Sequence, residues 1–177
     1  MNARRTVIVA IVLAVLIPVA AAGQAQETSG PVVWDVARDV LLDPTTYAPA
    51  VISYKAIHWD WETSQALFAH GWVEANPQFT ISGGPNDTPV TYVAGRRIIR
   101  RTALTILQFS ALNNAAAGIG ARVLETRYPS HKKLIRTLSW IERIGFASFV
   151  TYRNSADHIR QARTNRRLAK EHGYVAP

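Results

Sequence analysis

The feature that most constrains this chain is a long stretch without charge, residues 102–121, which directly follows a cluster of arginines. The cluster consists of Arg96, Arg97, Arg100 and Arg101. As a helix, twenty uncharged residues span about 30 Å, the thickness of the hydrocarbon core of a bilayer. The stretch is diluted by Gln108, Ser110, Asn113 and Asn114. It therefore predicts a long helix, which lies either in lipid or in a water-soluble bundle.

Prolines and turn residues divide the rest of the chain into helical segments. The breaks are Asp43-Pro44, Asn76-Pro77 and Tyr128-Pro129. The helices expected are a short amphipathic one at 31–42, one at 49–72, one that starts at Thr88-Pro89 and contains the uncharged stretch, and one at 131–152. No alternation typical of strands occurs over any length. The sequence predicts an all-α fold, a small antiparallel bundle of about three long helices plus one short amphipathic helix.

The first residues have the pattern of an export signal. Arg4 and Arg5 precede an uncharged run, and small residues near Ala20-Ala21-Ala22 suit cleavage by a signal peptidase. Residues 1–26 are predicted to be a signal peptide, with an uncleaved signal anchor as the alternative. We expect export to the inner membrane or periplasm of a bacterium. The lack of cysteine excludes disulfides and thiol chemistry there.

The chain is basic, with a formal net charge of +8 at pH 7. Residues 27–153 are expected to form the helical bundle, membrane-embedded in our preferred interpretation. Residues 154–177 are expected to form a basic helical tail that begins with Asn154-Ser155 as a cap. Because an export signal directs the charge towards anionic head groups, membrane lipids are the expected partners and nucleic acid is not.

Two architectures fit the pattern: helices in the membrane, or a soluble bundle in the periplasm. The uncharged stretch, its flanking arginines and the aromatic residues near segment ends favour the membrane. Lys55, Asp60 and Glu62 weigh against a lipid-facing helix at 49–72, since each charge costs about 2.5–3.5 kcal/mol at a bilayer centre. This helix is therefore expected either to be shielded by the later helices or to belong to an aqueous bundle.

One pair of residues has the spacing of metal ligands on a helix. His58 and Glu62 are four residues apart, as ligands of zinc helices are. The alternative is a polar stripe with Lys55 that faces water or head groups. No nucleophile elbow, phosphate loop or dinucleotide fingerprint occurs. We therefore expect no cofactor and no catalytic residue, and His58 and Glu62 remain weak metal candidates.

Several polar residues are costly where they stand and should have partners. Glu74, in the last turn of its helix, opposes the helix dipole, so a pair with the Arg96–Arg101 cluster is expected. Asp60 and Glu74 would lie about 21 Å apart along one continuous helix, too far for a catalytic dyad. In lipid, Glu142 should face Asn113, Asn114 or Lys55 across the bundle.

A short motif resembles one in other proteins. Asp60-x-x-Thr63, followed by Gly71-x-x-Glu74-x-Asn76-Pro77, resembles a pattern of small, uncharacterised, helical membrane proteins of bacteria. The match covers less than a fifth of the chain. It implies a membrane location and a structural or functional role for Asp60, Glu74 and Asn76, without naming an activity. Lys55 and Glu62 depart from the pattern.

Two hypotheses of function come from these observations. The first is a non-enzymatic envelope membrane protein with a structural or partner-binding role, whose partner is lipid or another envelope protein. The alternative is a soluble periplasmic helical domain that binds a small ligand. A metal-dependent enzyme that uses His58 and Glu62 is the least supported.

Overall fold

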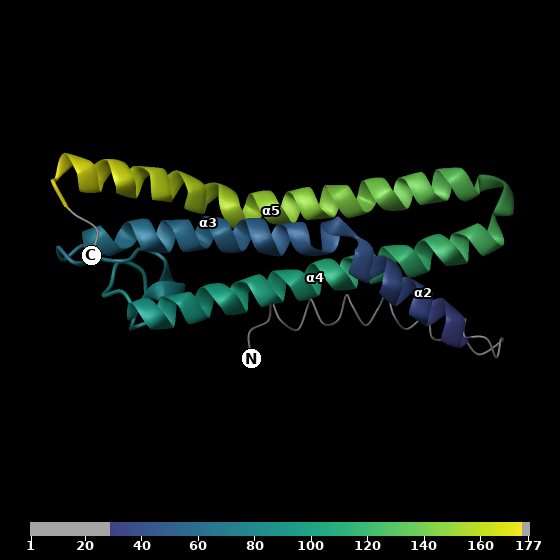
Figure 1. Cartoon of the computed structure of the whole chain (residues 1–177), viewed down its shortest axis with the longest axis horizontal. Coiled ribbons are helices and arrows are strands. Elements are labelled where there is room, and N and C mark those ends of the chain that lie inside the picture. The colour runs from purple at the N-terminus through teal and green to yellow at the C-terminus, as the bar shows by residue number, and fades with distance from the viewer. Residues whose placement is uncertain (1–28, 175–177) are drawn as a thin grey trace.

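Every regular element in the computed structural model, which describes residues 29–174, is a helix (Figure 1). The elements are α2 (Ser29–Leu42), α3 (Pro44–Phe68), η2 (Pro77–Phe79), α4 (Tyr92–Arg127), η3 (Pro129–His131) and α5 (Lys132–Glu171). Within these residues the backbone forms isolated bridges and no strand. The predicted all-α class, with three long helices and a short one, is confirmed. The signal predicted for residues 1–26 lies outside the described residues.

The three long helices lie side by side, with α4 running opposite to the other two (Figure 1). Asp43 and Asp60 of α3 contact Arg143 and His158 of α5, so these two helices run in the same direction. Asn113 contacts Glu142, and Ala117 contacts Ser139, so α4 and α5 run in opposite directions. The bundle is thus not antiparallel throughout.

Two of the predicted helix starts are wrong by a few residues. Helix α3 begins at Pro44, not at 49, because Asp43 caps it by accepting a hydrogen bond from the Thr45 backbone N–H at 2.9 Å. Helix α4 begins at Tyr92 rather than at Thr88-Pro89, and its cap is Thr91. Pro89 is held in an isolated bridge with Thr80, which keeps this segment extended.

Helix α5 continues through the predicted cap at Asn154-Ser155. Both side chains donate hydrogen bonds to carbonyls one turn earlier, Asn154 to Val150 at 2.7 Å and Ser155 to Thr151 at 2.6 Å. Such back-bonding is compatible with a helix interior. The domain boundary predicted between residues 153 and 154 therefore falls inside a single helix.

The apolar core lies near the end of α3, where α4 begins. Ile57, Trp61, Phe79 and Ile99 are buried together. Trp61 donates a hydrogen bond from Nε1 to the Tyr92 carbonyl at 3.3 Å, which satisfies its one polar atom. This core fixes the loop that joins α3 to α4.

None of the helices within residues 29–174 is both long enough and apolar enough to cross a membrane. This includes α4, which contains the uncharged stretch 102–121. The polar residues in this stretch lower its mean hydropathy below that of a membrane-spanning helix, contrary to the expectation that it crosses a bilayer.

Candidate functional site

A network around Asp60 joins α3 to α5. Its carboxylate contacts Nδ1 of His158 through Oδ2 at 2.7 Å and accepts a hydrogen bond from Asn165 Nδ2 through Oδ1 at 3.1 Å. Asn165 also donates to the Ser64 hydroxyl at 2.8 Å. Asn165 and Ser64 are buried. Asp60 therefore has a hydrogen-bonding partner on each carboxylate oxygen.

The parallel packing of α3 and α5 produces this network. Asp60 and Ser64 are one turn apart and share a face of α3, as the sequence spacing predicts. Asn165 can bond both groups because it faces that turn. His158 comes from the turn of α5 that faces Asp60. The partners are about one hundred residues away in sequence, so only the fold brings them together.

Glu74 returns to the same region through a tight turn. Helix α3 ends at Phe68, and Gly71 has a positive φ of 84°, a conformation that glycine adopts without strain. The Glu74 backbone then pairs with Asp87, with N–H to O distances of 2.9 and 3.1 Å. The predicted separation of 21 Å from Asp60 was wrong, because it assumed a helix that continues to Glu74. The two carboxylates line one groove.

Burial raises the pKa of Glu74 above its ordinary value, and the nearby Asp60 carboxylate raises it further. The Asn76 backbone N–H opposes this effect by donating to Glu74 Oε1 at 2.6 Å. A raised carboxyl pKa beside a second carboxylate in a groove is typical of a functional site. The expected pair with the arginine cluster is wrong, since no ion pair in residues 29–174 joins Glu74 to an arginine.

These groups line an open groove with a volume of about 410 Å³, which we call the carboxylate groove. Its lining includes Asp60, Ser64, Trp72, Glu74, His158 and Asn165. Asp157 lies at its rim, where its exposed carboxylate pairs with Arg160. The groove combines ionisable groups with an aromatic wall, a combination that suits a small ligand.

The structure divides the residues of the sequence motif. Asp60, Glu74 and Asn76 all line the carboxylate groove. Asn76 also caps η2 by accepting a hydrogen bond from the Gln78 N–H at 3.1 Å. Thr63 instead donates to carbonyls of its own helix, at 2.9 and 3.0 Å. Ser64, which the motif does not include, joins the network around Asp60 in place of Thr63.

His58 and Glu62 contact each other on α3, with Nε2 and Oε1 3.3 Å apart. Glu62 also accepts a hydrogen bond from the Tyr92 hydroxyl at 2.5 Å. His58 stacks on Tyr54, with ring centroids 5.6 Å apart. In the part of the chain that the structure describes, no three histidine, cysteine or acidic side chains are arranged to hold a metal.

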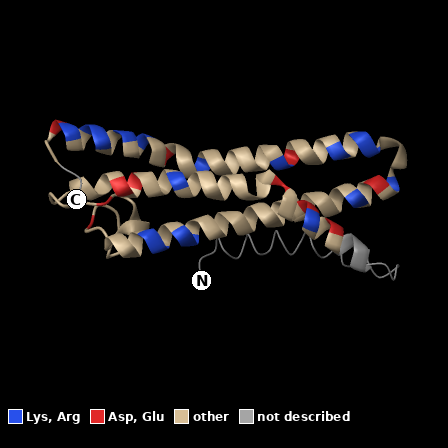
Figure 2. Ribbon diagram, in the orientation of Figure 1, with Lys and Arg blue, Asp and Glu red and all other residues tan. Residues whose placement is uncertain are grey.

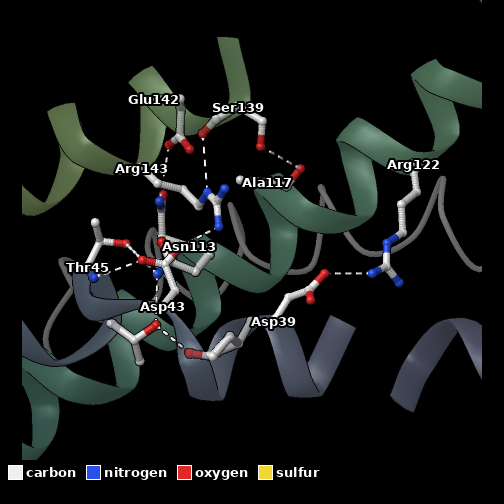
Figure 3. A network of polar contacts seen from close by, with 12 residues as sticks. Asp39, Asp43, Thr45, Asn113, Ala117, Arg122, Ser139, Glu142 and Arg143 are labelled. Carbon is white, nitrogen blue, oxygen red and sulfur yellow. Dashed lines mark hydrogen bonds and ion pairs between the residues drawn. The ribbon is translucent and has the colours of Figure 1, made fainter. Parts of the chain in front are cut away.

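A second polar network lies near the start of α3 (Figure 3). Asp43 pairs with Arg143, and both side chains are largely buried. Asn113, one of the three partners expected for Glu142 in lipid, donates to Glu142 at 3.1 Å. Asn114, which is buried, donates to the hydroxyls of Thr45 and Thr46, each at 2.8 Å. Polar groups therefore hold all three long helices together.

Away from the apolar core, small and polar residues fill much of the interior of the bundle, and many large apolar residues are exposed. The largest fully buried side chains among the described residues are Ile99, Pro49, Ser53 and Ser110. Large apolar residues stay exposed around the middle of the bundle, and we call them the apolar belt. The belt comprises Tyr47, Val51 and Ile52 of α3, Leu104, Phe109 and Leu112 of α4, and Leu138, Trp140, Ile141, Phe149 and Tyr152 of α5. Most charged residues lie towards the two ends (Figure 2).

Sequence reasoning missed His158 and Asn165 as members of the site. Both fall in the segment that the sequence predicts as a basic tail, whose many arginines favour contact with lipid head groups. One signal was available: Ser155, Ala162 and Asn165 recur at helical spacing and carry small or uncharged side chains. All three are buried.

The fold and the two networks define an all-helical bundle with buried polar networks beside an apolar core, and with an exposed apolar belt. Comparison of the chain with protein families, with curated proteins and with solved structures finds no match. The resemblance of the Asp60–Pro77 motif to helical membrane proteins therefore stays a prediction.

Proposed function

We propose that this protein is a non-enzymatic helical protein of the bacterial envelope that associates with membrane lipid through its apolar belt. The observation that carries the proposal is the distribution of side chains outside the apolar core. Serine, threonine, asparagine and alanine fill much of the contacts between helices, while leucine, phenylalanine and tryptophan side chains stay exposed. Helices that pack in lipid make such contacts, because small and polar residues hold them together there.

The energetics favour a covered belt. Burial of a leucine, isoleucine or phenylalanine side chain contributes about 1.5–3 kcal/mol. The belt leaves Leu138, Trp140, Ile141 and Phe149 of α5 between 53% and 63% exposed. Large exposed apolar side chains in such number favour an interaction with an apolar partner. Contact with lipid would recover the free energy that the monomer leaves unused.

The charge distribution supports the same proposal. The arginines at the start of α4 and those near the end of α5 lie at one end of the bundle (Figure 2). Clustered arginines next to an apolar surface favour anionic head groups, each charge contributing about 1 kcal/mol near the surface. The basic end would therefore lie among head groups while the belt contacts hydrocarbon.

Cosedimentation with phosphatidylcholine vesicles tests the proposal. The wild-type protein should bind, and Trp140→Gln with Ile141→Gln should weaken binding at least tenfold, because two large side chains leave the lipid. The matched control is Leu41→Gln with Leu42→Gln, which changes two exposed leucines of α2 outside the belt. Absence of wild-type binding, or equal losses in both variants, would refute the proposal.

A second candidate function is the binding of a small ligand in the carboxylate groove. The observation that favours it is that Asp60, Glu74 and His158 line one groove together with the Trp72 side chain. The pKa of Glu74 is raised in this groove. The structure offers these groups no metal arrangement within the described residues, so an organic ligand fits better. Both functions can coexist, because this groove and the apolar belt involve different residues.

A further inference from the structure

A second and larger groove lies between α4 and α5. Its volume is about 990 Å³. The buried residues Ile57 and Phe79 contribute to its lining from α3 and η2, and the two helices form its walls. The walls carry Ile106, Phe109, Phe146, Phe149 and Val150. The α4–α5 groove is thus mainly apolar and aromatic, and it opens on the apolar belt through Phe109 and Phe149.

Two arginines face this groove from opposite walls. The antiparallel register that pairs Asn113 with Glu142 also sets Arg101 opposite Arg153. The groove lining contains no acidic residue. Among the ion pairs and hydrogen bonds of residues 29–174, none involves Arg101 or Arg153. The groove therefore presents two unpaired cations above an apolar interior.

We propose that the α4–α5 groove binds one anionic phospholipid, with an acyl chain along the phenylalanines and the phosphate between Arg101 and Arg153. Three observations select this occupant. The interior is apolar, as an acyl chain requires. Guanidinium groups bind phosphate through paired N–H donors. The groove also opens on the surface that the proposed function places against lipid, and the inference rests on that function.

The charges on the groove need an anion. Arg101 and Arg153 repel each other across the groove, and the repulsion grows when lipid displaces water, because the local dielectric constant falls. A phosphate between them replaces repulsion with two attractive contacts. A neutral head group gives no such gain, so the site should discriminate between anionic and zwitterionic lipids.

Native mass spectrometry of detergent-solubilised protein with phosphatidylglycerol tests the proposal. The wild type should carry one phosphatidylglycerol at concentrations where phosphatidylcholine gives at least tenfold less complex. Arg101→Gln with Arg153→Gln should remove this preference. The matched control, Arg163→Gln with Arg166→Gln, deletes the same charge from exposed positions of α5 and should keep the preference. Equal effects of the two double variants would overturn the site.

Two further arms complete the experiment. Glycerophosphoglycerol, which has the head group without chains, should fail to displace the lipid, and effective competition would show an anion site without an acyl chain. Arg101→Lys with Arg153→Lys should keep part of the preference, since the charge remains, provided that circular dichroism shows unchanged helix content. Binding to phosphatidylcholine vesicles should be similar in wild type and glutamine variant, because a zwitterionic surface has no net charge to attract the arginines of the basic end. Failure of the groove is thus distinguishable from failure of the lipid association itself.

Discussion

At the scale of single residues, the site depends on the hydrogen bonds that the partly buried carboxylate of Asp60 makes. The Asp60 side chain is 15% exposed and has partners on both oxygens. Hydrogen bonds to charged groups contribute about 1.5–3 kcal/mol each, and loss of one partner leaves a desolvated group without compensation. His158 and Asn165 are therefore structural as well as candidate ligand-binding residues. The sequence could place Asp60 and Ser64 on one face, but it could not supply their partners.

Glu74→Gln should stabilise the protein at pH 7. The folded state raises the pKa of Glu74 above the unfolded value of 4.5, mainly through burial, so its charged form opposes folding. The neutral glutamine removes this cost, and its carbonyl can still accept the Asn76 N–H. Urea denaturation should show a higher free energy of unfolding for the variant at pH 7.

The sign of the pH dependence follows from the same shift. Because the folded pKa is the higher one, the contribution of Glu74 is fully favourable below pH 4.5 and is lost as the pH rises through the folded value. The advantage of the glutamine variant should shrink as the pH falls to 4.5. A constant difference between wild type and variant from pH 7 to 4.5 would contradict this account.

At the scale of elements, the closest contact between α3 and α4 depends on a glycine. A Cβ atom at Gly95 would lie 2.3 Å from ring atoms of Trp61, which is nearly fully buried. Trp61 also packs against Phe68 and Phe79, with ring centroids 5.6 and 5.2 Å away. The indole ring therefore has little room to move, and the helix approach requires the absence of a side chain.

Gly95→Ala should destabilise the protein by about 1–3 kcal/mol, the usual cost of overpacking a core. Gly120→Ala is the matched control on the same helix, because a Cβ there meets no atom within 4 Å. This control should be neutral or stabilising by up to about 1 kcal/mol through helix propensity. Thermal denaturation of both variants decides the matter, and a harmless Gly95→Ala would show that α3 and α4 are farther apart.

At the scale of the whole molecule, the end of α5 belongs to the bundle. Ala162 is fully buried and Ser155 is 4% exposed, although both lie in the segment first interpreted as a tail. Asn165 and His158 add polar contacts to α3. The carboxylate groove, the α4–α5 groove and the belt then lie on the same body, so lipid contact and groove binding are linked through one fold.

A chain that ends at Arg153 should lose more than its deleted residues. It lacks the two α5 partners of Asp60, and loss of their hydrogen bonds to a charged group costs on the order of 3 kcal/mol or more. Urea denaturation should show this loss of stability. Circular dichroism should show a loss of helix larger than the helix content of the deleted residues alone. His158→Ala with Asn165→Ala in the full chain should reproduce part of the loss. Stability equal to that of the full chain would identify 154–177 as an independent tail.

The sequence by itself determined the helical class and the approximate positions of the helices, because helix breakers, caps and spacing act within a few residues of each other. It predicted the all-α class, and it gave Asn113 as one of three partners expected for Glu142 in lipid. It did not predict the turn at Gly71, which brings Glu74 back towards Asp60.

Only the tertiary structure decided which helix faces which. The pairing of Asp60 with His158 joins positions that no local pattern connects, and it depends on α5 running parallel to α3. The same holds for Arg101 and Arg153, whose position across one groove follows from the register of α4 against α5. Side-chain spacing along a helix is local, whereas the packing of one helix on another depends on the whole set of contacting faces.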